Sequence, residues 1–267
     1  SGTLSAIEVL NIIKDKFLDS RIKADFFSVT DGGQESSEIF KSYNFQIEER
    51  FETLNCESSL SEVESLNVND SVFFESAQLI GIDSNKESMT ISSGCLYEAI
   101  QKTEILGTGG SKTVDFGIGL LGKMGMEFIS NGETIVDPVP QDFPFIDSIK
   151  TTDFNSDIAL KVLSDTNISL LGENSAFDVF GPQKGMSEED IVNHKLEVER
   201  LITLIDKELV LGLDPNEMFS GAAGGLSFTL SQILGCEIKS GAQYFLEETN
   251  LINELKNYDI GIFCEGK

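Results

Sequence analysis

The pattern of apolar positions predicts a helix at the start of the chain. Residues 4–17 read LSAIEVLNIIKDKF, with an apolar residue at every third position from Leu4 to Ile13. This spacing places the apolar side chains on one face of a helix. Ser1 or Thr3 can cap this helix, because a serine or threonine hydroxyl accepts a hydrogen bond from the backbone of the first turn.

A second, longer helix is predicted over residues 188–209. The segment EEDIVNHKLEVERLITLIDKEL carries apolar residues at helical spacing from Ile191 to Ile205. Ser187, followed by three acidic residues, is typical of a helix start. His194, the only histidine of the chain, lies in this helix, where we expect it to be partly exposed.

The rest of the chain alternates short apolar runs with glycine turns and helical segments. Residues 104–129 are expected to form a strand, a glycine loop and a helix. The other predicted strands are residues 24–30, 43–53, 71–82, 159–167 and 258–267, and the other predicted helices are residues 92–102 and 225–238. Strands that alternate with helices favour an α/β fold with parallel pairing in at least one sheet. The stretch 42–80 interrupts the alternation and is expected to mark an inserted or second domain.

The composition favours a globular protein and excludes several partners. Of 267 residues, 40% are hydrophobic, which is enough for a sizeable core. The 45 acidic and 19 basic residues give a net charge of -26, which argues against binding to nucleic acid or to anionic membranes. The sequence shows no signal peptide, lipidation motif or long apolar run, so we expect a cytoplasmic protein.

Cysteine and histidine chemistry is not indicated. The four cysteines are far apart in the sequence and form no C-x-x-C pair, so neither a zinc site nor a redox motif is predicted. With one histidine, a His-rich metal site is excluded, and a Ser-His-Asp triad would need His194 itself.

Four loops combine glycine with polar or charged side chains. Each alone is typical of a tight turn, but together they supply what phosphoryl transfer needs, namely backbone amides, a lysine and carboxylates. Pro182 and two flanking glycines shape the loop around Lys184, which precedes the helix start at Ser187, so that the loop can hold an anion. The loops are TDGG (30–33), GTGGSKTVDFG (107–117), SDTN (164–167) and GPQKG (181–185). The sequence therefore favours a small-molecule kinase.

In their order, these motifs resemble the bacterial type 1 glycerate kinases. The family pattern includes A-D-G-G-E-G-T, V-F-G-P-Q-K-G and G-A-A-G-G, and similar blocks cover essentially this whole chain. VFGPQKG and SGAAGG are the most specific. The blocks are GTLSA (2–6), TDGGQES (30–36), FESAQLIGI (74–82), GTGGSKTVDFGIGL (107–120), SDTNISLLG (164–172), VFGPQKG (179–185), SGAAGG (220–225) and CEGK (264–267).

The resemblance implies two α/β domains, a flavodoxin-like parallel-sheet domain interrupted by a second, mixed α/β domain. The flavodoxin-like domain would comprise residues 1–45 and 221–267, and the inserted domain residues 46–220. Measured against the family pattern, the flavodoxin-like domain would lack its first strand and its C-terminal part. The implied activity is transfer of phosphate from Mg-ATP to D-glycerate, a small-molecule substrate, and the oligomeric state is left open.

Motif matching also implies the site residues, which we expect to face a cleft between the two domains. Asp165 or Asp31 would act as base or Mg²⁺ ligand, with Asp165 the first choice for the metal. Lys184 would bind the glycerate carboxylate or a phosphate. The residues expected to bind substrate or nucleotide are Gly109, Gly110, Ser111, Asp115, Asn167, Gln183, Gly224 and Gly225.

One departure from the family pattern leaves two alternatives open. The N-D-G of the family's glycine loop is replaced by Val114, Asp115 and Phe116, and the phenylalanine ring is expected to occupy space that a ligand would need. This change favours a non-catalytic scaffold that binds a small carboxylate or a protein partner. The other alternative is a kinase that acts on a different hydroxy acid or sugar acid.

Overall fold

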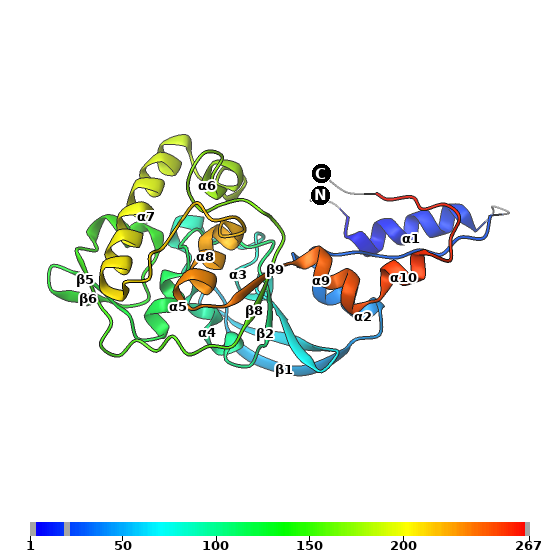
Figure 1. Ribbon diagram of the computed structural model, residues 1–267, viewed down its shortest axis with the longest axis horizontal. Helices are drawn as coiled ribbons and strands as arrows, with labels where there is room; N and C mark the ends of the chain where they lie inside the picture. The colour runs from blue at the N-terminus through cyan, green and yellow to red at the C-terminus, as the bar shows by residue number, and fades with distance from the viewer. Residues whose placement is uncertain (1–3, 19–21, 265–267) are drawn as a thin grey trace.

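The chain folds as an α/β protein, and a computed structural model describes residues 4–18 and 22–264 (Figure 1). The strands are β1 Gln46–Leu54, β2 Leu60–Val68, β3 Ser71–Glu75, β4 Ile105–Gly107, β5 Glu127–Ser130, β6 Glu133–Ile135, β7 Ser148–Lys150, β8 Lys161–Ser164 and β9 Glu237–Ser240. The α-helices are α1 Ala6–Phe17, α2 Ser36–Ser42, α3 Ala77–Ile80, α4 Tyr97–Ile100, α5 Ile118–Lys123, α6 Ala176–Phe180, α7 Glu188–Leu209, α8 Leu226–Phe228, α9 Gly241–Glu248 and α10 Leu251–Leu255. Short helical turns complete the fold: η1 Ser88–Thr90, η2 Ser93–Leu96, η3 Pro140–Phe145, η4 Pro182–Lys184, η5 Ala222–Gly225 and η6 Thr229–Ile233.

Six strands form the main sheet, in the order β1-β2-β3-β4-β8-β9. The four strands from β3 to β9 run parallel, whereas β1 and β2 pair antiparallel. Glu75 is in register with Gly107, which in turn is in register with Leu163. The loops that follow β3, β4 and β8 therefore leave the sheet at the same edge, where open α/β sheets bind ligands.

Each face of this sheet has its own apolar core, because neighbouring strand residues point to opposite faces. Phe73 and Leu163 belong to the core beneath α2, α9 and α10, whereas Phe74 and Val162 belong to the larger core. Figure 1 shows these three helices on one side of the sheet and α3, α4, α5, α7 and α8 on the other. The α/β class and its parallel-dominated sheet are thus confirmed. The domain boundaries after residues 45 and 220 stay predictions.

A smaller antiparallel sheet, β6-β5-β7, lies beside the long helix α7. Ser187 caps the start of α7 as predicted. Its Oγ accepts from Asp190 N (3.1 Å), and the Asp190 carboxylate accepts from Ser187 N (3.0 Å). Arg200 fastens α7 to η3 by donating to the carbonyl oxygens of Phe143 and Ile146 at 2.5 and 2.8 Å. The second sheet is not evident from the pattern of apolar positions, because its strands have only three or four residues.

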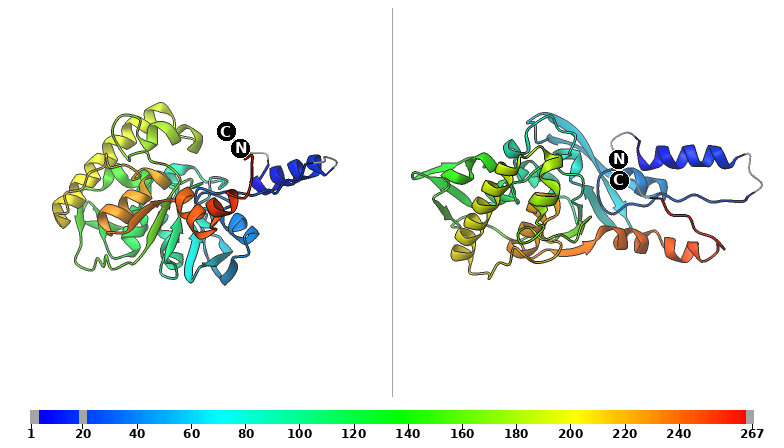
Figure 2. Two further views of the ribbon diagram at one scale, coloured as in Figure 1. Left: turned by 45° about the vertical axis from the view of Figure 1, so that its right-hand side comes forward. Right: turned by 90° about the horizontal axis from the view of Figure 1, so that it is seen from above.

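Helix α1 differs from the prediction in its cap and in its burial. Its N-cap is Ser5, whose hydroxyl accepts from Glu8 N at 3.1 Å, while Ser1 and Thr3 lie outside the described residues. None of the residues of α1 is fully buried. Figure 2 shows the reason, since α1 projects from one end of the molecule, away from the two sheets.

Two predicted strands are not strands in the described part of the chain. Residues 24–30 and 258–264 have no regular secondary structure, and neither segment pairs with a neighbouring strand. They are tied instead by side chains, since the Tyr258 hydroxyl donates to Asp25 at 2.7 Å and its ring meets the edge of Phe27. An apolar run without a partner strand lacks the backbone hydrogen bonds that define a sheet. Residues 265–267 of the predicted last strand lie outside the described residues.

The predicted helix over residues 225–238 is shorter and less regular than expected. Three α-helical residues lead into a π-helical turn, closed by the hydrogen bond from Leu234 N to Thr229 O at 3.0 Å. Gly235 has a φ of 71°, which ends the helix because a left-handed residue cannot continue it. The last predicted helical residues, Glu237 and Ile238, instead begin β9.

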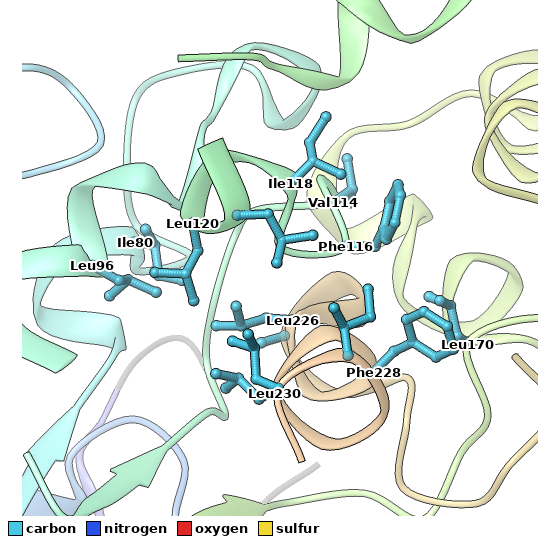
Figure 3. Close-up of a cluster of buried hydrophobic side chains, with 14 of the residues drawn as sticks. Ile80, Leu96, Val114, Phe116, Ile118, Leu120, Leu170, Leu226, Phe228 and Leu230 are labelled. Atoms are coloured by element: carbon cyan, nitrogen blue, oxygen red, sulfur yellow. The ribbon is translucent and has the colours of Figure 1, made fainter. Parts of the chain in front are cut away.

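Phe116 contributes its whole ring to the larger core. The side chain is fully buried, packs edge-on against Phe143 with ring centroids 5.6 Å apart, and lies beside Val114 and Ile118 (Figure 3). Its backbone has a φ of 39°, in the left-handed region that glycine adopts without strain. The ring therefore stabilises the core at a position where the backbone itself favours glycine.

Two substitutions at Phe116 are expected to separate packing from backbone strain. Phe116→Ala removes the buried ring and should lower the free energy of unfolding by about 3–5 kcal/mol. Phe116→Gly removes the same ring but relieves the backbone, so it should be less destabilising than Phe116→Ala by about 1 kcal/mol. Urea denaturation measures both, with Phe145→Ala as the control because that ring is 65% exposed. A glycine variant that is no more stable than the alanine variant would show that the backbone at residue 116 is not strained.

Candidate active site

A cavity of about 200 Å³ opens at the carboxyl ends of β4 and β8. The loop after β4 supplies one wall and the residue after β8 supplies a carboxylate, while the segments around η4 and η5 close the other sides. The lining residues are Ile82, Thr108, Gly109, Gly110, Ser111, Asp165, Thr166, Phe180, Gln183, Lys184, Ala222, Ala223 and Gly224. Loops that are far apart in the sequence thus meet at one place.

Lys184 is a buried cation in the wall of this cavity. Its side chain is held in η4, between Pro182 and Gly185, and only 6% of the residue is exposed. Nζ donates one hydrogen bond to the carbonyl of Thr113 at 2.8 Å. Burial lowers the pKa of Lys184 to about 8, although the charges of Asp165 and Asp115 oppose this effect. An ammonium has three donors, so two remain for other acceptors.

Asp165 places a carboxylate at the cavity, and Asp31 lies near it. Asp165 directly follows β8 and lines the cavity, while Asp31 does not. The pKa of Asp165 is raised, first because the surrounding protein displaces water and second because of the negative charge of Asp31, but the residue is exposed to solvent, which weakens both effects. Asp31 accepts a hydrogen bond from Gly33 N at 3.0 Å. The charge of Asp31 thus acts on Asp165, although only Asp165 lines the cavity.

Glycines allow the loops that carry these carboxylates to touch. A Cβ on Gly109 would overlap the backbone of Gly33 and would lie 2.7 Å from Asp165 Oδ2. Gly110 has a φ of 72°, and a Cβ there would meet the Gln34 side chain at 2.7 Å. Only glycine permits this packing, so the glycine loop is required by the contact between the loops, whether or not it also contacts a ligand.

Ser111 brings an unsatisfied hydroxyl to the cavity. The residue is 4% exposed, and its Oγ has no hydrogen-bond partner among the described residues. The hydroxyls of Ser37, Ser76 and Ser227, none of which lines the cavity, also lack a partner among the described residues, so this feature does not by itself mark a ligand. Gln183, another of the residues expected at the site, also lines the cavity.

Asp115 lies behind the cavity and holds the loop around it. Its carboxylate is fully buried and accepts hydrogen bonds from Ser93 N (2.7 Å), Gly117 N (3.1 Å), Gly119 N (3.3 Å) and Thr113 Oγ1 (2.8 Å). Burial raises the pKa of this carboxyl, while the hydrogen bonds act in the opposite direction. All of its contacts are with the protein's own backbone and hydroxyl groups, so its observed role is to shape the loop.

The three remaining residues expected at the site, Gly224, Gly225 and Asn167, lie in different surroundings. Gly224 lines the cavity. It also packs so closely against the Thr113 carbonyl that a Cβ at this position would overlap it. A Cβ on Gly225 would lie 2.6 Å from that of Phe116, so this glycine packs against the core. Asn167 is exposed and does not line the cavity.

Two expectations about side chains near the site are wrong. The Phe116 ring does not fill ligand space, because it points into the apolar core and does not line the cavity. His194 is not partly exposed but buried, with its Nε2 2.7 Å from the Val114 carbonyl. Burial lowers its pKa to about 4. Helical spacing places His194 on the same face as Ile191 and Val198, which are also buried, so the periodicity of α7 was the signal that could have predicted this burial.

Sequence reasoning also missed several residues that shape the site. Ile82 and Phe180 give the cavity its large apolar side chains, and both belong to motif blocks that could have identified them. Glu75, at the end of β3, is buried and accepts from Glu35 N and Ser37 N at 2.8 and 2.9 Å. It thereby fixes the loop that carries Asp31. Burial raises the pKa of Glu75, in opposition to these hydrogen bonds.

The carboxylates of Asp31 and Asp165 are donors of the kind that Mg²⁺ prefers. Among the described residues no group of three or more histidine, cysteine, aspartate or glutamate side chains could hold a metal. Mg²⁺ usually takes one or two carboxylates and completes its shell with phosphate oxygens and water. The repulsion between the two carboxylates is the feature that a cation would relieve. The described helices include none long and apolar enough to cross a bilayer.

Comparison with known proteins gives the relatives of this chain. The chain is 30% identical to glycerate 2-kinase of Escherichia coli K12 over 172 residues, which cover 61% of this chain and 43% of that protein. Glycerate kinase of Bacillus subtilis 168 is 28% identical over 177 residues, or 65% of this chain and 46% of that protein. The matched segments span less than half the length of these curated relatives.

The fold and the family follow from two further matches. A crystal structure assigned to glycerate kinase 2 from Salmonella typhimurium LT2 superposes with a TM-score of 0.73 at 24% identity, covering 96% of this chain and 73% of that chain. Its likeness supports the α/β architecture. The sequence model of the glycerate kinase family matches residues 1–267, and the protein therefore belongs to the glycerate kinase family.

Proposed function

We propose that this chain carries the active site of a phosphotransferase that moves the γ-phosphate of Mg-ATP to a hydroxyl of D-glycerate. The observation that carries the proposal is the buried ammonium of Lys184 at a small cavity that also holds Ser111 and Asp165. Family membership supports the reaction class. The buried ring of Phe116 removes the steric argument for a non-catalytic scaffold.

The cavity is suited to a short hydroxy acid. Two donors on Lys184 are available to a carboxylate, and a charge-assisted hydrogen bond in a buried site is strong. Its volume of about 200 Å³ is below the roughly 300–1,000 Å³ of sites for drug-sized ligands. This size is compatible with a three-carbon acid, and Ile82 and Phe180 give the cavity its large apolar side chains.

Asp165 is the group that would accept the proton of the reacting hydroxyl. Of the two carboxylates it is the one that lines the cavity, where its exposed position leaves it open to a substrate hydroxyl. The hydroxyl oxygen would form the new bond to phosphorus, its proton would pass to Asp165, and ADP would leave with the electrons of the broken bond. With Asp165 as the base, Asp31 would be the residue that holds Mg²⁺, which supplies charge neutralisation for the phosphates when bound.

Replacing Asp165 by asparagine should remove turnover while the fold is kept. We expect kcat for glycerate-dependent ADP release to fall about 10²- to 10⁴-fold, because a general base contributes that much. The melting temperature should stay within a few degrees, since Asp165 lies on the surface of the cavity and accepts no hydrogen bond that an apolar core depends on. Asp157→Asn, at an exposed position outside the cavity, is the control. Full activity in Asp165→Asn would refute the assignment of the base.

Replacing Lys184 by methionine should weaken binding of the acid. The change keeps the length of the side chain and removes the ammonium, so the KM for D-glycerate should rise about 10- to 100-fold, as expected for one hydrogen bond to a charged group. The KM for ATP should change less. Lys207→Met, at an exposed position on α7, serves as control. An unchanged KM for glycerate in a folded variant would show that the acid binds elsewhere.

The pH dependence should report the charge of Lys184. Below its pKa of about 8 the ammonium attracts the carboxylate, and above it the neutral amine does not. We therefore expect kcat/KM for glycerate to fall as the pH rises through about 8, and this alkaline decline to be absent in Lys184→Met. A wild-type profile that stays flat to pH 10 would contradict the role of this cation.

Glycerate-independent ADP release, or none at all from a folded sample, would support one of the alternatives. A substrate panel that includes four-carbon hydroxy acids distinguishes another hydroxy acid kinase from a glycerate kinase. Binding of glycerate without turnover would favour the non-catalytic scaffold.

A further inference from the structure

Two buried nitrogen atoms hold two successive carbonyl groups of one loop. Lys184 Nζ donates to Thr113 O at 2.8 Å, and His194 Nε2 lies 2.7 Å from Val114 O. Because its pKa is lowered to about 4, His194 is neutral at physiological pH. A carbonyl oxygen can only accept, so the facing nitrogen of the neutral ring must carry the proton. His194 therefore donates from Nε2.

The imidazole is fixed in direction by two aromatic rings. It stacks on Phe143 with ring centroids 5.2 Å apart, and it meets Phe177 edge-on at 4.7 Å. Only 3% of His194 is exposed, on the inner face of α7. The side chain thus combines an apolar environment with one directed hydrogen bond, and an apolar residue would satisfy the first requirement but not the second.

The loop that His194 holds forms the layer behind the cavity. Gly224, in the cavity wall, lies against the Thr113 carbonyl so closely that a Cβ would not fit. Phe116 N donates to Gly224 O at 3.1 Å. A movement of residues 113–116 would therefore move both the acceptor of Lys184 and the wall at Gly224.

We propose that His194 is a positioning residue, which acts through the Val114 and Thr113 carbonyls to hold the Lys184 ammonium at the cavity. Without the imidazole N–H, the Val114 carbonyl would be buried without a donor, and this segment would rotate to find one. That rotation would carry the neighbouring Thr113 carbonyl away from Lys184. The effect on substrate rests on the proposed function, whereas the effect on Lys184 does not.

The test compares two substitutions of His194 in the full chain. His194→Phe keeps a ring for the contacts with Phe143 and Phe177 but removes the donor. His194→Gln places an amide N–H at a similar reach and serves as the matched variant that restores the hydrogen bond. If His194→Phe fails to reach the wild-type circular dichroism spectrum, His194→Met is measured in its place, because its flexible side chain adapts to the site.

Two measurements decide the proposal. Acylation of Lys184 by an N-hydroxysuccinimide ester at pH 8, followed by peptide mass spectrometry, reports the exposure of the amine without any turnover. In His194→Phe we expect this rate and the KM for D-glycerate each to rise about tenfold, as for the loss of one hydrogen bond. The value of kcat should change less than about threefold, and His194→Gln should stay within about threefold of wild type in every quantity.

The outcomes separate this inference from the proposed function. If the wild type shows no glycerate-dependent turnover, the proposed function fails, and the acylation rates still decide the role of His194. If a folded His194→Phe protein leaves the acylation rate of Lys184 unchanged, His194 is a core residue only and the inference is wrong. Equal effects of the phenylalanine and glutamine variants would also overturn it, since they would show that the hydrogen bond is not what matters.

Discussion

The hydrogen bond from the Lys184 ammonium to the Thr113 carbonyl joins η4 to the loop that follows β4. Burying a cation is unfavourable unless it is hydrogen-bonded and accompanied by opposite charge. Here the carbonyl supplies the hydrogen bond, and Asp165 and Asp115 supply the negative charge. The position of the loop around Asp115 therefore determines where the ammonium lies. The ammonium in turn gives the cavity wall its positive charge.

Close backbone contacts give that loop its position. The Asp115 carboxylate accepts from donors in its own loop and from Ser93 N and Gly119 N outside it. Gly224 allows the η5 backbone to lie against Thr113. On the other side of the cavity, Gly109 allows the β4 loop to touch the loop of Asp31. The parallel strands β4 and β8 place these contacts at one edge of the sheet. A site built in this way is rigid, and rigid placement of charges is the main contribution of a protein to phosphoryl transfer.

The sequence was most informative where structure is determined locally. The cap at Ser187, the strand and glycine loop after residue 104, and the turn around Lys184 follow from side-chain periodicity and turn chemistry. The motif order also brought together residues that line one cavity, among them Gly109, Ser111 and Lys184. The direction of each side chain was not accessible, because it depends on tertiary packing. Phe116 is the example, since its ring turns into the core from a loop that the sequence placed at the ligand.

Long-range pairing was the other limit. Residues 24–30 have the composition of a strand, but a strand needs a neighbour, and no local pattern reports whether one is present. The burial of His194 could be predicted from the helical spacing of Ile191 and Val198, but its partners Phe143 and the Val114 carbonyl come from distant segments and could not.

A crystal structure of the protein with D-glycerate would test the central claim most directly. The account predicts that the acid lies in the cavity with a carboxylate oxygen about 2.7–3.2 Å from Lys184 Nζ, within reach of Ser111 Oγ, and with a hydroxyl toward Asp165. Glycerate bound outside the cavity, or bound there with its carboxylate directed away from Lys184, would contradict the account.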